Sequence, residues 1–288
     1  MAVPTNEDLA KALTSYDSLL AQRSSSSSGK RSPLLPSSTL VELEERVWEH
    51  IPAVLASRSQ PHLNREELLI CLAWKLGRGK YRPTLPSLVA SNSEEKVVEV
   101  TGKAWRSFIP AREAREEDSL RNFPCLRILT SLRGIGPATA SLLLGIFEVA
   151  ARSDGSRCAQ EEEGFMSDES WSCLPALQGR KVAYGEADWK RWRSAWGERL
   201  REWDRGARQL DRATWAYREG GGRGGGGGGV DEEGQEIART KEKKTSTKLE
   251  LEPPVDMGKK RGGDERGEQE EGRATKRTNT RTRTRGRR

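Results

Sequence analysis

Apolar residues recur at spacings of three and four positions over most of the chain up to Tyr217, which predicts amphipathic helices. Capping-box patterns, in which a small polar residue is followed three positions later by an acidic one, mark three helix starts: Thr39 with Glu42, Asn64 with Glu67, and Ser91 with Glu94. The third helix is expected to stop at Pro110, because proline lacks the N–H that a helix interior requires. The sequence contains no alternating strand pattern, so we predict an all-α fold.

A stripe rich in tryptophan predicts one long helix from Ala187 to Tyr217. Its members recur at spacings of three, four and seven positions: Trp189, Trp192, Trp196, Leu200, Trp203 and Leu210. We interpret these rings, together with Trp74, as core residues. Stacking on nucleic-acid bases is the alternative, but it needs exposed rings beside a groove rather than a seam along one helix face.

Both ends of the chain differ in composition from the central part. Residues 1–38 are expected to hold a short amphipathic helix between Asn6 and Gln22 and a Ser/Pro-rich linker, so that the folded domain spans 39–218. Residues 219–288 are rich in glycine and charge and nearly free of apolar residues, which predicts a disordered tail. The basic clusters of this tail fit nuclear import or loose phosphate contact, and a solvated run of charge is the alternative.

The balance of charge favours a polyanionic partner. The 50 Lys and Arg residues outnumber the 43 Asp and Glu residues, which gives a formal net charge of +7. The four cysteines form no Cys-x-x-Cys pair, so we expect free thiols, no metal site and no cofactor. The longest apolar run, from Ser141 to Ala151, is too short to cross a membrane.

The strongest local pattern is Leu-Arg-Gly-Ile-Gly-Pro-Ala-Thr-Ala, from Leu132 to Ala140, which predicts a helix-hairpin-helix within residues 124–150. Gly134 and Gly136 would let the backbone approach a phosphate oxygen. The helix that follows would aim its free N–H groups and the positive end of its dipole at the same anion. An αα-hairpin with a purely structural role is the alternative. The predicted phosphate contacts are Arg133, Gly134, Ile135, Gly136, Ala138 and Thr139.

A basic turn is expected around residues 77–86. Positive charges with one aromatic ring among them suit phosphate contacts and stacking, so further DNA contacts are predicted here: Lys75, Arg78, Lys80, Tyr81 and Arg82. A solvated basic loop is the alternative, because such clusters are common on protein surfaces.

Several of these segments resemble a known superfamily. The nonapeptide resembles the hairpin of DNA glycosylases of the endonuclease-III type, and residues 39–217 are similar to amun-like eukaryotic glycosylase-like proteins, many of them fungal. The similarity is carried by Trp74 to Pro83, the hairpin, Phe165 to Glu169, and Trp215. It implies an all-α, DNA-glycosylase-like domain and a location in the nucleus.

The resemblance also implies where catalytic groups would stand. Active members carry an aspartate about one helix beyond the hairpin that stabilises the developing sugar cation, and Asp168 is the matching position here. Residues 154–164 look like an insertion that lengthens this spacing, and a helix-capping role for Asp168 is the alternative. Bifunctional members carry a nucleophilic lysine two residues after the second glycine; Ala138 stands there, so lyase chemistry by that route is not expected.

Three functional hypotheses are consistent with these features. The first is a nuclear DNA-binding protein that contacts the duplex backbone with little sequence preference and has no membrane partner. The second is a monofunctional DNA glycosylase of base-excision repair that uses Asp168, which would require aromatic and polar residues to converge beside that carboxylate. The third is a protein-interaction adaptor whose tail alone touches nucleic acid and which would lose DNA binding if the chain ended at Gly220.

Overall fold

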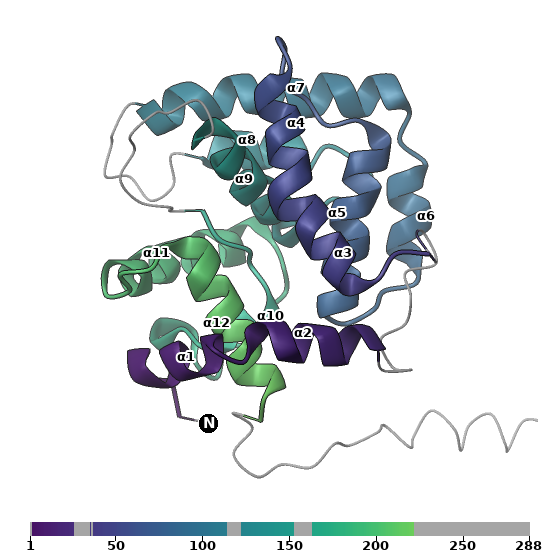
Figure 1. The fold of residues 1–288 in the computed structure, drawn as a ribbon. Helices are drawn as coiled ribbons and strands as arrows, with labels where there is room; N and C mark the ends of the chain where they lie inside the picture. Colours follow the sequence, from purple (N-terminus) through teal and green to yellow (C-terminus); the bar gives the residue numbers. More distant parts are fainter. Residues whose placement is uncertain (1, 26–34, 36, 114–121, 153–162, 222–288) are drawn as a thin grey trace, which may run out of the picture. The chain divides into compact units, whose positions relative to one another are not determined.

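The computed structural model describes residues 2–25, 35, 37–113, 122–152 and 163–221. All regular structure in these residues is helical (Figure 1), which confirms the predicted all-α class. The helices of the first half are α1 (Asn6–Leu13), α2 (Tyr16–Ser25), α3 (Leu40–Glu45), η1 (Arg46–His50), α4 (Ile51–Ser57), α5 (Arg65–Arg78), α6 (Thr84–Ala90) and α7 (Glu94–Glu113). The second half contains α8 (Phe123–Leu129), α9 (Pro137–Arg152), α10 (Asp168–Ser172), η2 (Pro175–Leu177), α11 (Glu186–Arg201) and α12 (Ala207–Glu219).

The N-terminal segment forms two helices that belong to the folded unit, where the sequence predicted one helix and a domain that begins at residue 39. Figure 1 shows α1 and α2 packed against α12, and their apolar side chains Leu9, Tyr16 and Leu20 are buried in the common core. The helix is interrupted between α1 and α2 at Thr14, whose hydroxyl donates to the carbonyl of Lys11 at 2.7 Å. The core therefore extends to the N-terminal side of the predicted boundary.

Two of the three predicted helix starts are confirmed. The side chains of Thr39 and Asn64 each accept a hydrogen bond from the backbone N–H three residues on, and each forms a complete capping box. The third helix, α7, starts two residues later than predicted, because Ser93 rather than Ser91 accepts the N–H of Lys96, at 3.3 Å. It also continues through Pro110, since one missing N–H in the last turn does not end a helix of this length.

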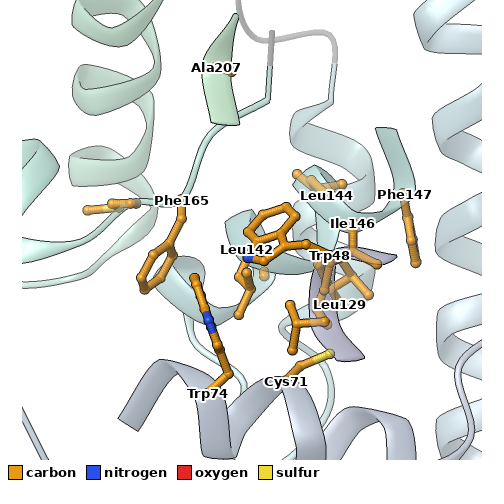
Figure 2. Packing of buried hydrophobic residues seen from close by; sticks show 14 of the residues in the cluster. Trp48, Cys71, Trp74, Leu129, Leu142, Leu144, Ile146, Phe147, Phe165 and Ala207 are labelled. Atoms are coloured by element: carbon orange, nitrogen blue, oxygen red, sulfur yellow. The ribbon is translucent and has the colours of Figure 1, made fainter. Parts of the chain in front are cut away.

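The tryptophan stripe lies in the core, as predicted, but it spans two helices. Residues 202–206 separate α11 from α12, and Gly206 supports this turn with a φ of 81°. The rings of the stripe are buried. Figure 2 shows another part of this core, where Trp74 of α5 reaches toward Leu142 and Phe165; its ring centroid is 5.6 Å from that of Trp48 and 5.7 Å from that of Phe165.

Helix α9 is the central element of the core, and nearly every one of its residues is buried. It contacts α4, α5, α7 and α8, so the helix is held in place from several sides. Three of the cysteines, Cys71, Cys125 and Cys173, are buried free thiols, and Cys158 lies outside the described residues. Among the described helices, none is both long and apolar enough to span a membrane.

Candidate functional site

The turn between α8 and α9 uses its two glycines for different purposes. Gly134 has a φ of 78°, and a Cβ at this position would lie 2.8 Å from Cγ2 of Val89 on α6. Its missing side chain is therefore required by backbone conformation and by packing inside the protein. The structure thus explains the glycine at position 134 without the predicted approach of a phosphate to the backbone.

Gly136 faces open space instead. A Cβ built there meets nothing within 4 Å, and the residue is exposed. Within the described residues, the backbone N–H groups of Gly136, Ala138 and Thr139 have no hydrogen-bond acceptor, as is usual for the first turn of a helix. Because the dipole of the 16-residue helix α9 points its positive end here, this turn has the properties of an anion site.

Asn92 holds the turn in its conformation, a role that the sequence analysis did not identify. Its buried side-chain amide accepts the N–H of Arg133 and donates to the carbonyl of Arg133, both at 3.0 Å. The side chain of Arg133 remains exposed, where it could meet a phosphate. Ile135 differs from its prediction: its side chain is buried, and its N–H donates to the carbonyl of Leu132 at 3.2 Å. It stabilises the turn and has no free amide.

A cavity of about 180 Å³ lies beside the turn. It brings together the four segments on which the sequence resemblance rests, although these segments are separated along the chain by dozens of residues. Its walls also include Tyr184, from a loop that the sequence analysis did not consider. The residues on which the following paragraphs depend are Lys75, Lys80, Arg82, Gly136, Thr139, Phe165, Asp168, Glu169 and Tyr184.

The cations of the predicted basic cluster do not all face the same surroundings, because the end of helix α5 buries one of them. Helix α5 continues to Arg78 rather than ending before Gly77, and this turns the Arg78 side chain into the core. There its guanidinium donates to Asp211 at 2.7 Å and lies 4.6 Å from the centroid of the Trp74 ring. Burial is the largest single influence and opposes the charge, but the nearby Asp211, Tyr16 and Glu44 together outweigh it and raise the pKa of Arg78. The prediction that Arg78 contacts DNA is therefore wrong, because its charge is already paired.

Three other cations of this segment line the cavity. Lys80 and Arg82 are exposed, and the Arg82 guanidinium lies 5.5 Å from the ring centroid of Tyr184. Lys75 is partly buried, and its Nζ donates to Oγ1 of Thr139 at 2.5 Å. Tyr81, the predicted stacking ring, instead packs partly buried against the core.

The environment of Lys75 disfavours its charged form. Burial and, to a smaller extent, the nearby charge of Arg82 together lower the pKa of Lys75 to about 8, while Asp168 acts in the opposite direction. A lysine with this pKa is neutral in a substantial fraction of molecules near physiological pH.

Asp168 lies in the first turn of α10 and lines the cavity. The N-cap of this helix is Ser167, whose hydroxyl accepts the N–H of Ser170 at 3.0 Å, so Asp168 is not the capping residue. The exposed carboxylate of Asp168 accepts a hydrogen bond from the hydroxyl of Tyr184. Burial raises the pKa of Tyr184, and this hydrogen bond to Asp168 raises it further. Burial likewise raises the pKa of the neighbouring Glu169.

Tyr184 is also unusual in its backbone. Its φ of 59° makes it the one non-glycine residue in the left-handed region among those described. Such a conformation costs of order 1–3 kcal/mol and is found preferentially at functional sites. A sequence gives no signal for it, because tyrosine is not a residue that favours this region.

Comparison with known proteins adds no family assignment: no protein-family model, no curated protein and no solved structure matches the chain. Among the described residues, no group of three or more His, Cys, Asp or Glu side chains is arranged to hold a metal ion. The cavity and the turn beside it are therefore the features of the molecule that bear on its function.

Proposed function

We propose that this chain is a nuclear DNA-binding protein built on a DNA-glycosylase-like helix-hairpin-helix scaffold. The observation that carries the proposal is the first turn of α9, where free N–H groups at Gly136, Ala138 and Thr139 border the same cavity as the cations Lys80 and Arg82. Free amides at a helix N-terminus, with positive side chains nearby, form a site suited to a phosphate of the DNA backbone.

This arrangement favours binding without sequence recognition. Amide and cation contacts to phosphate hold the duplex in place but do not read base edges. Each neutralised phosphate releases counterions, so the affinity should fall steeply as salt rises. Exposed Arg133 would add one more such contact.

The test is a salt titration of duplex binding by fluorescence anisotropy, with Gly136→Glu compared with the wild type. The new carboxylate would project into open space and repel the phosphate, so we expect binding to weaken by at least tenfold at low salt. Ser194→Glu, an equal change of charge at an exposed position of α11, serves as the control and should bind as the wild type does. Equal affinity of a folded Gly136→Glu protein would disprove the phosphate site.

A second candidate function is base excision by a monofunctional glycosylase. The observation that favours it is the convergence of aromatic and polar side chains, Phe165 and Tyr184 among them, beside the carboxylate of Asp168. Such a carboxylate would stabilise the positive charge that develops at C1′ as a base departs.

This candidate is tested by release of bases from damaged and mismatched duplexes. Release by the wild type that is lost in Asp168→Asn but kept in Asp204→Asn, an exposed aspartate outside the cavity, would establish the enzyme. Tight, salt-sensitive binding without release would leave DNA binding as the function.

A further inference from the structure

Lys75 differs from the other cations of the site in what surrounds its charge. Its Nζ reaches the cavity from α5 and meets the first turn of α9 through the hydroxyl of Thr139, 2.5 Å away. Within the described residues, no carboxylate oxygen lies within 4.0 Å of this Nζ, whereas Arg78, one turn further along the same helix, is paired with Asp211 at 2.7 Å. Lys75 thus keeps its amine directed at the space that a ligand would occupy.

The amine also has the properties of a nucleophile. An amine attacks only in its neutral form, and the lowered pKa of about 8 makes that form accessible at physiological pH. Partial burial in a cavity with apolar walls such as Leu76, Leu85 and Phe165 is the kind of environment that produces reactive lysines. The position of the amine matters as much. Lys75 contacts Thr139, the neighbour of Ala138, and Ala138 stands where bifunctional members of the resembled superfamily carry their lysine.

We propose that Nζ of Lys75 forms a Schiff base with the aldehyde of an abasic deoxyribose held at the turn. This inference rests on the proposed DNA-binding function, which would bring the sugar to the cavity by holding the phosphates next to it. The substrate class is an aldehyde sugar in DNA, because an amine needs a carbonyl carbon as its partner. Lys75 would then supply, from α5, the nucleophilic amine that the hairpin lacks.

The step balances without any further reagent. The lone pair of the neutral Nζ attacks C1′ of the ring-opened sugar, the C=O π bond opens, and a proton moves from nitrogen to oxygen to give a carbinolamine. The carbinolamine hydroxyl takes up one proton from solvent and leaves as water, while the nitrogen lone pair forms the C=N bond of a protonated imine. Hydrolysis reverses these events and returns the free amine, so the link is transient.

The experiment is reductive trapping by the full-length chain. The protein is mixed with a labelled duplex that contains one abasic site, and sodium borohydride converts any imine into a stable secondary amine by adding hydride to its carbon. We expect a covalent adduct with the wild type and at least a tenfold lower yield with Lys75→Met and with Lys75→Arg, which keeps the positive charge but not the nucleophile. Lys103→Met, an exposed lysine on α7 outside the cavity, is the matched control and should trap as the wild type does.

Two further readouts distinguish a reacting amine from one that only supports the fold. Peptide mapping of the reduced adduct by mass spectrometry should place the sugar on residue 75. The rate of trapping should rise as the pH passes through about 8, because the neutral amine is the reacting form.

Each outcome separates this inference from the function on which it depends. An adduct mapped to Lys75 and lost in both variants supports it, and an adduct that persists in the variants or maps to another amine overturns it. Salt-sensitive binding of the abasic duplex without any adduct overturns it and leaves the DNA-binding proposal intact. Absence of binding to any duplex removes the DNA-binding proposal, and this inference with it.

Discussion

Lys75 and Arg78 lie one turn apart on α5, and the two regions around them treat a positive charge in opposite ways. Around Arg78 the protein supplies a carboxylate from Asp211 and the faces of two tryptophan rings, and it excludes water. Around Lys75 it supplies a hydroxyl and a cavity. A charge whose partner is built into the fold contributes to stability, whereas a charge left facing a cavity is available to a ligand. The following predictions test this division.

The largest expected effect comes from removing the partner of the buried charge. Asp211→Ala leaves Arg78 buried without a carboxylate, which should lower the free energy of unfolding by about 3–5 kcal/mol. Urea denaturation followed by circular dichroism measures this. The matched substitution at exposed Asp204 should change stability by less than about 0.5 kcal/mol. If the two variants were equally stable, the buried pair would not hold α5 to α12.

The two glycines of the turn should also differ in how much their substitution lowers stability, with the residue that packs inside the protein being the more sensitive one. Gly134→Ala places a Cβ within 2.8 Å of Val89 in a left-handed backbone, and we expect a loss of about 1–3 kcal/mol. Gly136→Ala has open space for its Cβ and should leave stability within about 0.5 kcal/mol of the wild type. Thermal unfolding of both variants checks the contrast. Comparable destabilisation by both would mean that Gly136 also serves packing.

The exposed cations should alter binding without altering stability. If Lys80 and Arg82 each contact one phosphate, Lys80→Met and Arg82→Met should each reduce the slope of log affinity against log salt by about 0.9, with an unchanged melting temperature. Lys103→Met, outside the cavity, should leave the slope as it is. A slope that stays at the wild-type value in the two cavity variants would remove these residues from the interface.

The last prediction concerns a dependence of stability on pH that arises from Lys75. Its pKa is about 8 in the folded state and 10.5 as a reference value, so between these values the unfolded chain binds more protons. Stability from this group is therefore fully present above 10.5 and is lost as the pH falls through 8. The wild type should gain stability over this window relative to Lys75→Met. The free energy of unfolding of both proteins is measured by denaturation at several pH values. If it changed with pH by the same amount in both, the lowered pKa would be contradicted.

The cavity shows how far the sequence analysis reached. Residues predicted from three separate segments of the sequence, among them Lys75, Gly136 and Asp168, come together around one space in the structure. Tyr184 and Asn92 were not predicted, because neither belongs to a motif. Tyr184 reaches Asp168 from a loop, and Asn92 holds a turn more than forty positions away. Contacts of this kind depend on distance in space, to which sequence spacing gives no access.

The sequence by itself determined the helical class, two of the helix starts and the buried fate of the tryptophans. These features follow from local physics, namely periodicity and capping, which act over a few neighbouring residues. Only the tertiary structure decided that Arg78 is paired with a carboxylate while Lys75 is not. It also decided that Gly134 serves packing while Gly136 faces open space. In each pair the residue types are alike, and the difference comes from the partner that the fold brings within a few ångströms.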